Sequence, residues 1–392
     1  MNLTDRAAIA GIGQTEFSKA SGRTELRLAV EAITSALDDA GLPAAEVDGL
    51  TTFTYDTNPE IALARALGMK ELTFFSRVPY GGGAACAVLH QAAMAVATGA
   101  ARTLVAYRAL NMRSGARAGS RAGAVIAQVN AEEVARSWYA PFGIRTPAAM
   151  AALFATRYAH EFGADSTDFG RVSVTSRAHA ATNPDAWFHG KPITLEEHQS
   201  SRWIVEPLRL LDCCQESDGA VAVVVTSPER ARDLRRPPAM IRAAAQGAAA
   251  DQHEMTSYYR PSPADAQLPE MAVVARQLYT AAGLEPADID AAMLYDHFSP
   301  YVLPQLEAFG FCKPGEAAAL VRSGAIGLEG ALPVNTHGGQ LGEGYLHGMN
   351  GITEAVRQVR GTAANQLASA HNVLVTAGAG VPTSGTIIGS AR

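Results

Sequence analysis

The chain has 392 residues, of which 48% are hydrophobic and 18% are charged. A chain of this length corresponds to about two to four domains, which excludes a disulfide-stapled mini-protein. The low share of charged residues indicates a large buried surface, part of it between subunits. The formal net charge of −6 offers no positive surface to a phosphate backbone, so nucleic acid is not an expected partner.

Targeting and cysteine patterns give the next expectations. Residues 1–12 lack the charged and apolar regions of a signal peptide, and no run reaches the roughly 18 apolar residues of a membrane span. We therefore expect a cytoplasmic protein. The cysteines show no CxxC spacing, so the sequence predicts free thiols and no metal site. They are Cys86, Cys213, Cys214 and Cys312.

The first elements in chain order alternate between strand and helix. Residues 7–11 read as an apolar strand, and apolar positions in 24–40 recur at helical spacing until Gly41 ends the run. Residues 47–53 then read as a second strand. A glycine-rich turn, Gly81 to Gly83, leads into a predicted helix, and an apolar strand follows. That helix spans 84–98 and that strand 103–107.

This order of elements is repeated later in the chain. The segment 40–48 is echoed by 282–290 at a constant offset of 242 residues, and a second glycine-rich turn, helix and strand follow that copy. The repeat predicts two similar α/β halves, 1–235 and 236–392, with mostly parallel sheets covered by helices. The linker between them is expected at 235–238.

A polar insertion at about 111–202 is absent from the second copy. Insertions of this kind usually lie over a site, so we expect it to act as a cap. Its basic side chains could meet phosphates, although exposure to solvent is the commoner fate of any one of them. These are Arg113, Arg117, Arg121, Lys191 and Arg202.

Three further motifs carry polar groups in glycine-rich surroundings. The turn at Gly82 enters a helix, where backbone N–H groups can hold an oxyanion. The segment 335–348 combines five glycines with His337, His347 and a tyrosine. The segment 294–299 ends an apolar strand, where α/β sheets commonly bind ligands.

Specific strings then resemble the thiolase superfamily over essentially the whole chain, in its sterol-carrier and lipid-transfer-protein branch. They are Thr146-Pro147 with 152–155, then 207–214, and finally 217–220. The resemblance implies an α/β thiolase fold with two similar halves in five layers, a tight homodimer and a coenzyme A thioester as substrate. It implies no cofactor, because the coenzyme A belongs to the substrate.

The catalytic positions depart from the thiolase pattern. The nucleophilic cysteine of thiolases falls on Gly82, and their second cysteine falls on Thr376. The two characteristic histidines fall on Tyr345 and Tyr295. Cys86 lies on an apolar helix face and is expected to be a buried structural thiol. Without a nucleophile no acyl-enzyme forms, so Claisen acyl transfer is not expected.

Tyrosine at both positions resembles the lipid-transfer-protein aldolases of bacterial steroid side-chain degradation. This resemblance implies retro-aldol cleavage of a β-hydroxyacyl-CoA, in which a 17-hydroxy steroid with a short side chain gives a 17-keto steroid and propionyl-CoA. Tyr295 and Tyr345 would transfer protons, and the N–H groups of Gly82 and Gly378 would hold the enolate oxygen. The supporting candidates are Asp296, His297, His337 and His347, the histidines as donors or cations that lower a tyrosine pKa.

Two alternatives stay open at this point. One is a thiolase that uses Cys86 as a relocated nucleophile, and the other is a non-catalytic acyl-CoA-binding scaffold that has lost its chemistry. The resemblance also implies a partner, a hydratase subunit that carries an OB-type domain called DUF35.

Overall fold

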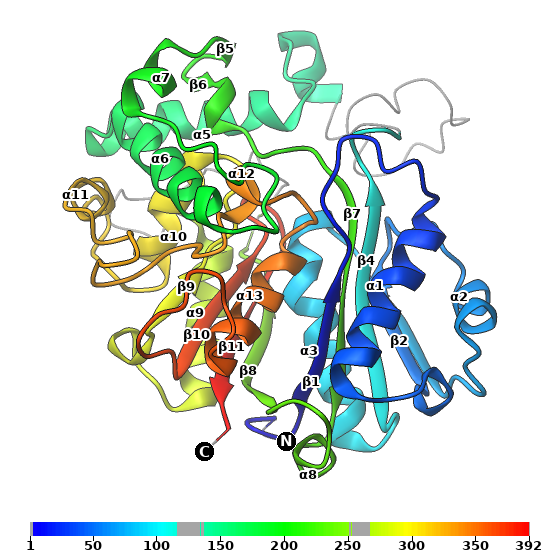
Figure 1. The fold of residues 1–392 in the computed structure, drawn as a ribbon. Helices are drawn as coiled ribbons and strands as arrows, with labels where there is room; N and C mark the ends of the chain where they lie inside the picture. The colour runs from blue at the N-terminus through cyan, green and yellow to red at the C-terminus, as the bar shows by residue number, and fades with distance from the viewer. Residues whose placement is uncertain (1–2, 116–133, 135–136, 251, 253–266, 392) are drawn as a thin grey trace.

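The computed structural model describes residues 3–115, 134, 137–250, 252 and 267–391. Nine strands form one continuous sheet, drawn in Figure 1. In spatial order they are β3 (Phe74–Val78), β2 (Gly49–Phe53), β4 (Thr103–Asn111), β7 (Asp218–Thr226), β1 (Ala8–Gln14), β8 (Ala239–Gly247), β11 (Thr383–Ser390), β10 (Asn372–Ala377) and β9 (Ala291–Met293).

The strand order in one half of the sheet mirrors the strand order in the other half across the centre. The order β2-β4-β7-β1 is followed by β8-β11-β10-β9, and the halves join where Ala8 pairs with Met240. The sequence repeat is visible in this geometry, because β2 and β9 begin 242 residues apart, at Gly49 and Ala291. The predicted duplication therefore corresponds to two structurally equivalent groups of strands.

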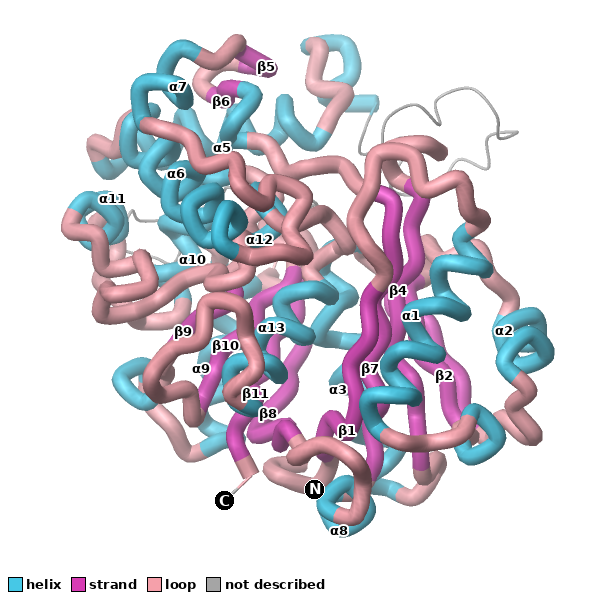
Figure 2. The backbone as a smooth tube through the Cα atoms, viewed as in Figure 1, coloured by secondary structure: helices cyan, strands magenta, loops and turns pink. Residues whose placement is uncertain are grey.

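Helices cover both faces of each half and give five layers (Figures 1 and 2). Helix α1 packs on the outer face of the first half, α9 on that of the second, and α3 and α13 lie between the halves. Their bounds are α1 (Glu25–Ala40), α3 (Ala85–Thr98), α9 (Pro269–Ala282) and α13 (Met349–Arg360). Three hydrophobic cores fill the spaces between these layers. The layered α/β architecture expected from the resemblance is confirmed.

Helix α1 shows how local sequence sets these elements. The side chain of Thr24 accepts a hydrogen bond from the N–H of Arg27 and caps the first turn. Gly41 ends the helix in the left-handed conformation, with φ of 75°, which glycine adopts without steric cost. The predicted helix at 24–40 is thus confirmed.

The sheet is mixed, so the prediction of mostly parallel sheets was wrong. Strand β2 is parallel to β3 and β4, and β9 is parallel to β10. The other pairs are antiparallel. The cause is the connections: β10 returns directly into β11 over a short turn, and β7 returns after the insertion rather than after a crossover helix.

The insertion forms a helical layer above the second half (Figure 2). Its helices are α5 (Pro147–Phe162), α6 (Ser166–Thr182) and α7 (Leu195–Ser200), and the small strands β5 (Trp203–Val205) and β6 (Leu208–Arg209) follow it directly. Helix α6 packs on α11 (Ala317–Arg322) and α12 (Gly339–Gly342), so the insertion contacts the second half although it lies within the first half in sequence. Arg117 and Arg121 lie outside the described residues.

The remaining α-helices of the described ranges are short. They are α2 (Glu60–Leu67), α8 (Pro228–Arg232) and α10 (Val302–Ala308). The connection between α8 and β8 contains the predicted boundary at 235, which stays a prediction. Within the described ranges, none of the helices combines the length and the apolar character that a membrane crossing requires. The four cysteines are free thiols, as predicted.

Candidate active site

The structure brings Tyr295 and Tyr345 together although 50 residues separate them in sequence. Tyr295 follows the end of β9 by two residues, and Tyr345 lies between α12 and α13. Their hydroxyl oxygens are 3.1 Å apart, within hydrogen-bond distance, and both side chains are buried. Two phenols in contact form a short path for a proton.

Backbone contacts fix the position of Tyr295. Its N–H donates to the side-chain oxygens of Gln305, at 3.1 Å, and Thr376, at 2.9 Å. The amide nitrogen of Gln305 donates to the carbonyl of Tyr295 at 2.8 Å. The hydroxyl of Thr376 also donates to Gln305 at 2.7 Å. Thr376 therefore helps to hold Tyr295 in position.

The glycine turn lies directly against Tyr295. Gly82 belongs to a 3-10 turn at Gly81–Ala84, and a Cβ added to Gly82 would lie 1.8 Å from the Tyr295 hydroxyl oxygen. Gly378 has a positive φ of 85°, and a Cβ there would lie 2.7 Å from Cα of Gly83. The two predicted oxyanion glycines are therefore on adjacent turns beside the tyrosine pair.

Tyr345 is carried by a segment that the insertion covers. Its N–H donates to the hydroxyl of Ser217 at 3.2 Å, and it pairs with Glu216 in an isolated β-bridge. The N–H of Trp187, in the insertion, donates to the carbonyl of Glu343 at 2.9 Å. Ala180 of α6 fills the space that a side chain on Gly342 would need. The insertion thus packs against the loop that carries Tyr345 and is hydrogen-bonded to it.

Burial sets the protonation of the two tyrosines. Removal from water raises the pKa of Tyr295 and of Tyr345, so both are neutral phenols at pH 7. The positive charge of Arg108 opposes this effect at Tyr345 and lowers its pKa. Of the two hydroxyls, that of Tyr345 is therefore the easier to ionise.

The nearby histidines are uncharged. Burial lowers the pKa of His297 and of His337 to about 3, and that of His347 well below its ordinary value. They can serve as hydrogen-bonding groups but not as cations at pH 7. The buried cation of this region is Arg108, the one charged residue of strand β4, with 1% of its surface exposed. The sequence analysis missed Arg108, although a single charged residue in a buried strand could have indicated a functional group.

Asp296 and His337 contact the loop that leads to Tyr345. The carboxylate of Asp296 accepts from the N–H of Gln340 at 2.7 Å, at the start of α12. Burial raises its pKa to about 6, while backbone N–H groups act in the opposite direction. His337 lies 3.7 Å from the carboxylate of Glu343. These two residues shape the glycine-rich loop.

Cys86 is a poor nucleophile. Its thiol is fully buried in α3 and donates to the carbonyl of Val375 at 3.6 Å. Burial raises its pKa far above that of a free cysteine, so almost no thiolate is present at pH 7. The structure therefore argues against the relocated-nucleophile alternative.

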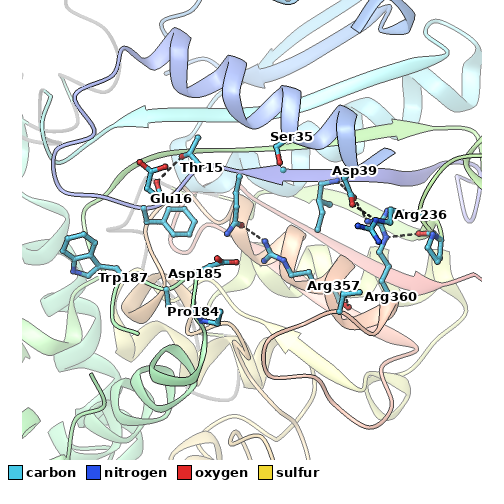
Figure 3. Close-up of a pocket in the computed structure, with 17 residues that line it drawn as sticks. Thr15, Glu16, Ser35, Asp39, Pro184, Asp185, Trp187, Arg236, Arg357 and Arg360 are labelled. Carbon is cyan, nitrogen blue, oxygen red and sulfur yellow. Dashed lines mark hydrogen bonds and ion pairs between the residues drawn. The ribbon is translucent and has the colours of Figure 1, made fainter. Parts of the chain in front are cut away.

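A separate cavity of about 630 Å³ lies between β1, α13 and the loop 184–187 of the insertion (Figure 3). Its three arginines all make contacts within the protein. Arg357 donates to Gln14 at 2.7 Å, while Arg360 and Arg236 both pair with Asp39. Neither tyrosine of the candidate site lines this cavity.

Comparison with known proteins identifies the family. Residues 7–229 match the family model described as Thiolase, N-terminal domain, and residues 250–388 match that of Thiolase C-terminal domain-like. The chain belongs to the thiolase family. The matched segments together cover most of the chain and both of its structural halves, which confirms the resemblance drawn from the sequence.

Individual relatives define the branch. The chain is 62% identical to the steroid side-chain-cleaving aldolase of Thermomonospora curvata, over 100% of this chain and 99% of that protein. It is 61% identical to the 17-hydroxy-3-oxo-4-pregnene-20-carboxyl-CoA lyase of Mycobacterium tuberculosis, over 99% and 100%. The solved structure of an Ltp2-ChsH2(DUF35) aldolase matches with a TM-score of 0.95 and 60% identity over the full length of both chains.

Proposed function

We propose that this thiolase-family chain is a carbon–carbon lyase that cleaves a steroid β-hydroxyacyl-CoA by a retro-aldol reaction. The observation that carries the proposal is the pair of hydroxyl groups of Tyr295 and Tyr345. This pair lies beside Gly82, where the resemblance would put the nucleophilic cysteine of a thiolase. The high identity to a side-chain-cleaving aldolase and to a carboxyl-CoA lyase supports the same reaction class.

The substrate follows from the chemistry that these relatives' names describe. In a 17-hydroxy steroid with a 20-carboxyl-CoA side chain, the hydroxyl stands β to the thioester carbonyl. The C17–C20 bond breaks, its electron pair enters the thioester as an enolate, and C17 becomes a ketone. Protonation of the enolate at C20 then gives propionyl-CoA.

The two tyrosines provide the proton path in this proposal. The hydroxyl of Tyr345 takes the proton from the 17-hydroxyl group, and the hydroxyl of Tyr295 gives a proton to C20. Transfer across the 3.1 Å contact between them restores both phenols. One proton enters the pair and one leaves it, so no phenolate has to persist in a site whose burial disfavours one.

The enolate oxygen needs hydrogen-bond donors that are already in position. We assign this role to the backbone N–H groups of Gly82 and Gly378, which lie on neighbouring turns beside Tyr295. No cofactor takes part in these steps, because the thioester itself accepts the electron pair.

A homodimer and a DUF35 partner complete the proposal. Edge strand β3 exposes 62% of Phe75, with Tyr55 and Tyr80 also exposed nearby, and an apolar sheet edge suits pairing with a second copy. The DUF35 subunit is proposed because the similar solved aldolase carries that domain in its name. A cytoplasmic location remains our expectation.

Product analysis tests this function. The purified chain, with and without the DUF35 subunit, is incubated with the 17-hydroxy steroid 20-carboxyl-CoA in D₂O, and the products are measured by mass spectrometry. We expect equal amounts of the 17-keto steroid and of propionyl-CoA carrying one deuterium at C2. Intact substrate in both incubations, or free coenzyme A with an uncleaved steroid side chain, would overturn the proposal.

A further inference from the structure

A partly buried hydrogen bond joins Arg108 of β4 to His347, two residues after Tyr345. The Nε–H of Arg108 donates to Nδ1 of His347 at 3.2 Å. The same guanidinium donates through Nη1 to the carbonyl of Ala109 at 2.9 Å and lies 3.4 Å from the carboxylate of Asp56. The guanidinium of Arg108 is therefore held in place by several contacts, and its Nε–H points toward His347.

This contact determines where the proton of His347 lies. A guanidinium carries donors only and stays protonated in proteins, so Nδ1 of His347 has to be the acceptor. A neutral imidazole that accepts at Nδ1 carries its hydrogen at Nε2. Burial and the charge of Arg108 both lower the pKa of His347, which keeps the ring neutral at pH 7.

The ring is also held in one orientation. It stacks on Phe53, with ring centres 5.7 Å apart, and meets Tyr345 edge-on at 5.2 Å. Its Nε2 lies 3.8 Å from the point where a Cβ on Gly81 would stand. The N–H of His347 therefore lies beside the glycine turn that contacts Tyr295.

We propose that His347 donates its Nε2–H to the thioester oxygen of the substrate, and that Arg108 is the positioning residue that fixes this tautomer. This inference rests on the proposed function. The donor adds to the backbone N–H groups at Gly82 and Gly378 and stabilises the same enolate oxygen. Because the ring is neutral, it gives a hydrogen bond without releasing its proton to the enolate.

The first test reads the tautomer and does not depend on turnover. Two-bond ¹⁵N–¹H correlation spectra of the ¹⁵N-histidine-labelled protein, assigned with a His347→Gln variant, show which ring nitrogen carries hydrogen. We expect Nε2–H alone in the wild type. In the double variant Arg108→Met/Asp56→Asn, which removes the donor and leaves no unpaired buried carboxylate, we expect both tautomers. A wild-type Nδ1–H signal would overturn the inference while leaving the lyase function intact.

A matched pair of variants tests the donation itself. Asparagine at 347 suits the positive φ of 55° and can accept from Arg108, but it has no donor at the Nε2 position. Glutamine reaches that position with its amide N–H but does not accept at the Nδ1 position. If the Nε2–H contacts the thioester, His347→Asn loses about 100-fold in kcat with little change in KM.

In the same experiment, His347→Gln should keep activity to within about tenfold of wild type, because one donor is retained. The opposite order, with Asn active and Gln inactive, would show that His347 serves only to satisfy Arg108 and would overturn the inference. A wild type that binds but never cleaves the thioester would overturn the proposed function, and with it this role, whatever tautomer the spectra show.

Discussion

The hydroxyl oxygen of Tyr295 occupies the space that any side chain on residue 82 would require. The point where a Cβ on Gly82 would stand is 1.8 Å from that oxygen and 2.2 Å from Cζ of the ring. A side chain at position 82 and the tyrosine at position 295 therefore exclude each other sterically. In the proposed function, Tyr295 is a proton-transfer group and takes the space that a nucleophilic side chain at position 82 would need.

Replacement of this glycine gives the first prediction. Gly82 does not have a positive φ, so Gly82→Ala adds no backbone strain, but its methyl group has to displace Tyr295. We expect kcat to fall by about 100-fold or more, since misplacement of a catalytic group by about 1 Å costs that much. Product formation by mass spectrometry measures the loss.

A double variant separates this effect from other damage to the turn. In a Tyr295→Ala background the space is empty, and Gly82→Ala should cause almost no further loss. Full activity of the single variant would contradict the steric relationship, and so would additive losses in the double variant.

The sequence predicted the order of the main helices and strands and singled out the two tyrosines. The repeat at an offset of 242 residues predicted equivalent halves, and the caps of α1 set its ends within a residue. The tyrosines themselves were assigned through resemblance to thiolase positions. Their contact depends on tertiary packing, because β9 and the loop before α13 meet only in the folded chain.

Other features could not be obtained from the sequence. Arg108 looks like one charge on an ordinary strand until β4, Asp56 and His347 are brought together in space. The charge of the histidines depends on burial, which composition does not reveal. The antiparallel direction of β7 depends on how the chain returns to the sheet after the insertion. The alternation of helices and strands in the sequence does not determine this direction.

The second prediction concerns Cys86. Its buried thiol donates to the carbonyl of Val375 within a hydrophobic core, so Cys86→Ser should keep turnover within a few fold and lose mainly stability, about 1 kcal/mol. Iodoacetamide should leave Cys86 of the native wild type unmodified, as peptide mass spectrometry can show. A thousandfold loss of turnover in a folded Cys86→Ser protein would revive the relocated-nucleophile alternative.

The third prediction is a pH dependence from Asp296. Burial raises its pKa from the ordinary 3.8 to about 6, so the folded state binds this proton more tightly than the unfolded state. The stability that it contributes is fully present below about pH 4 and is lost as the pH rises to about 6. The Tm of the wild type should therefore fall relative to the Tm of Asp296→Asn as the pH rises from about 4 to about 6. A shift in the other direction would contradict the raised pKa.

The fourth prediction addresses the dimer. A charge on the apolar edge of β3 should oppose pairing of two copies there, so Phe75→Glu is expected to move the protein toward a 41.0 kDa monomer in light scattering. Leu153→Glu, at a half-exposed apolar residue of α5 in the insertion, is the matched control and should leave the mass unchanged. An unaltered dimer in Phe75→Glu would place the interface elsewhere.

The last prediction divides the proton transfers between Tyr345 and Tyr295. The charge of Arg108 favours ionisation of Tyr345, and in the proposed function Tyr345 is the base at the 17-hydroxyl group and Tyr295 the acid at C20. Phenylalanine at either position keeps the ring and removes only the hydroxyl. Each single variant should therefore lose about 100- to 10,000-fold in kcat with little change in KM.

The double variant tests whether the two hydroxyls act as one relay. If the proton crosses their 3.1 Å contact, removal of the second hydroxyl adds almost nothing to the loss caused by the first. In Tyr295→Phe, the enolate would have no acid to protonate it at C20. This variant should therefore release the 17-keto steroid more slowly and show a changed solvent isotope effect. Independent, multiplicative losses would contradict the relay, and wild-type turnover in Tyr345→Phe would refute its role as the base.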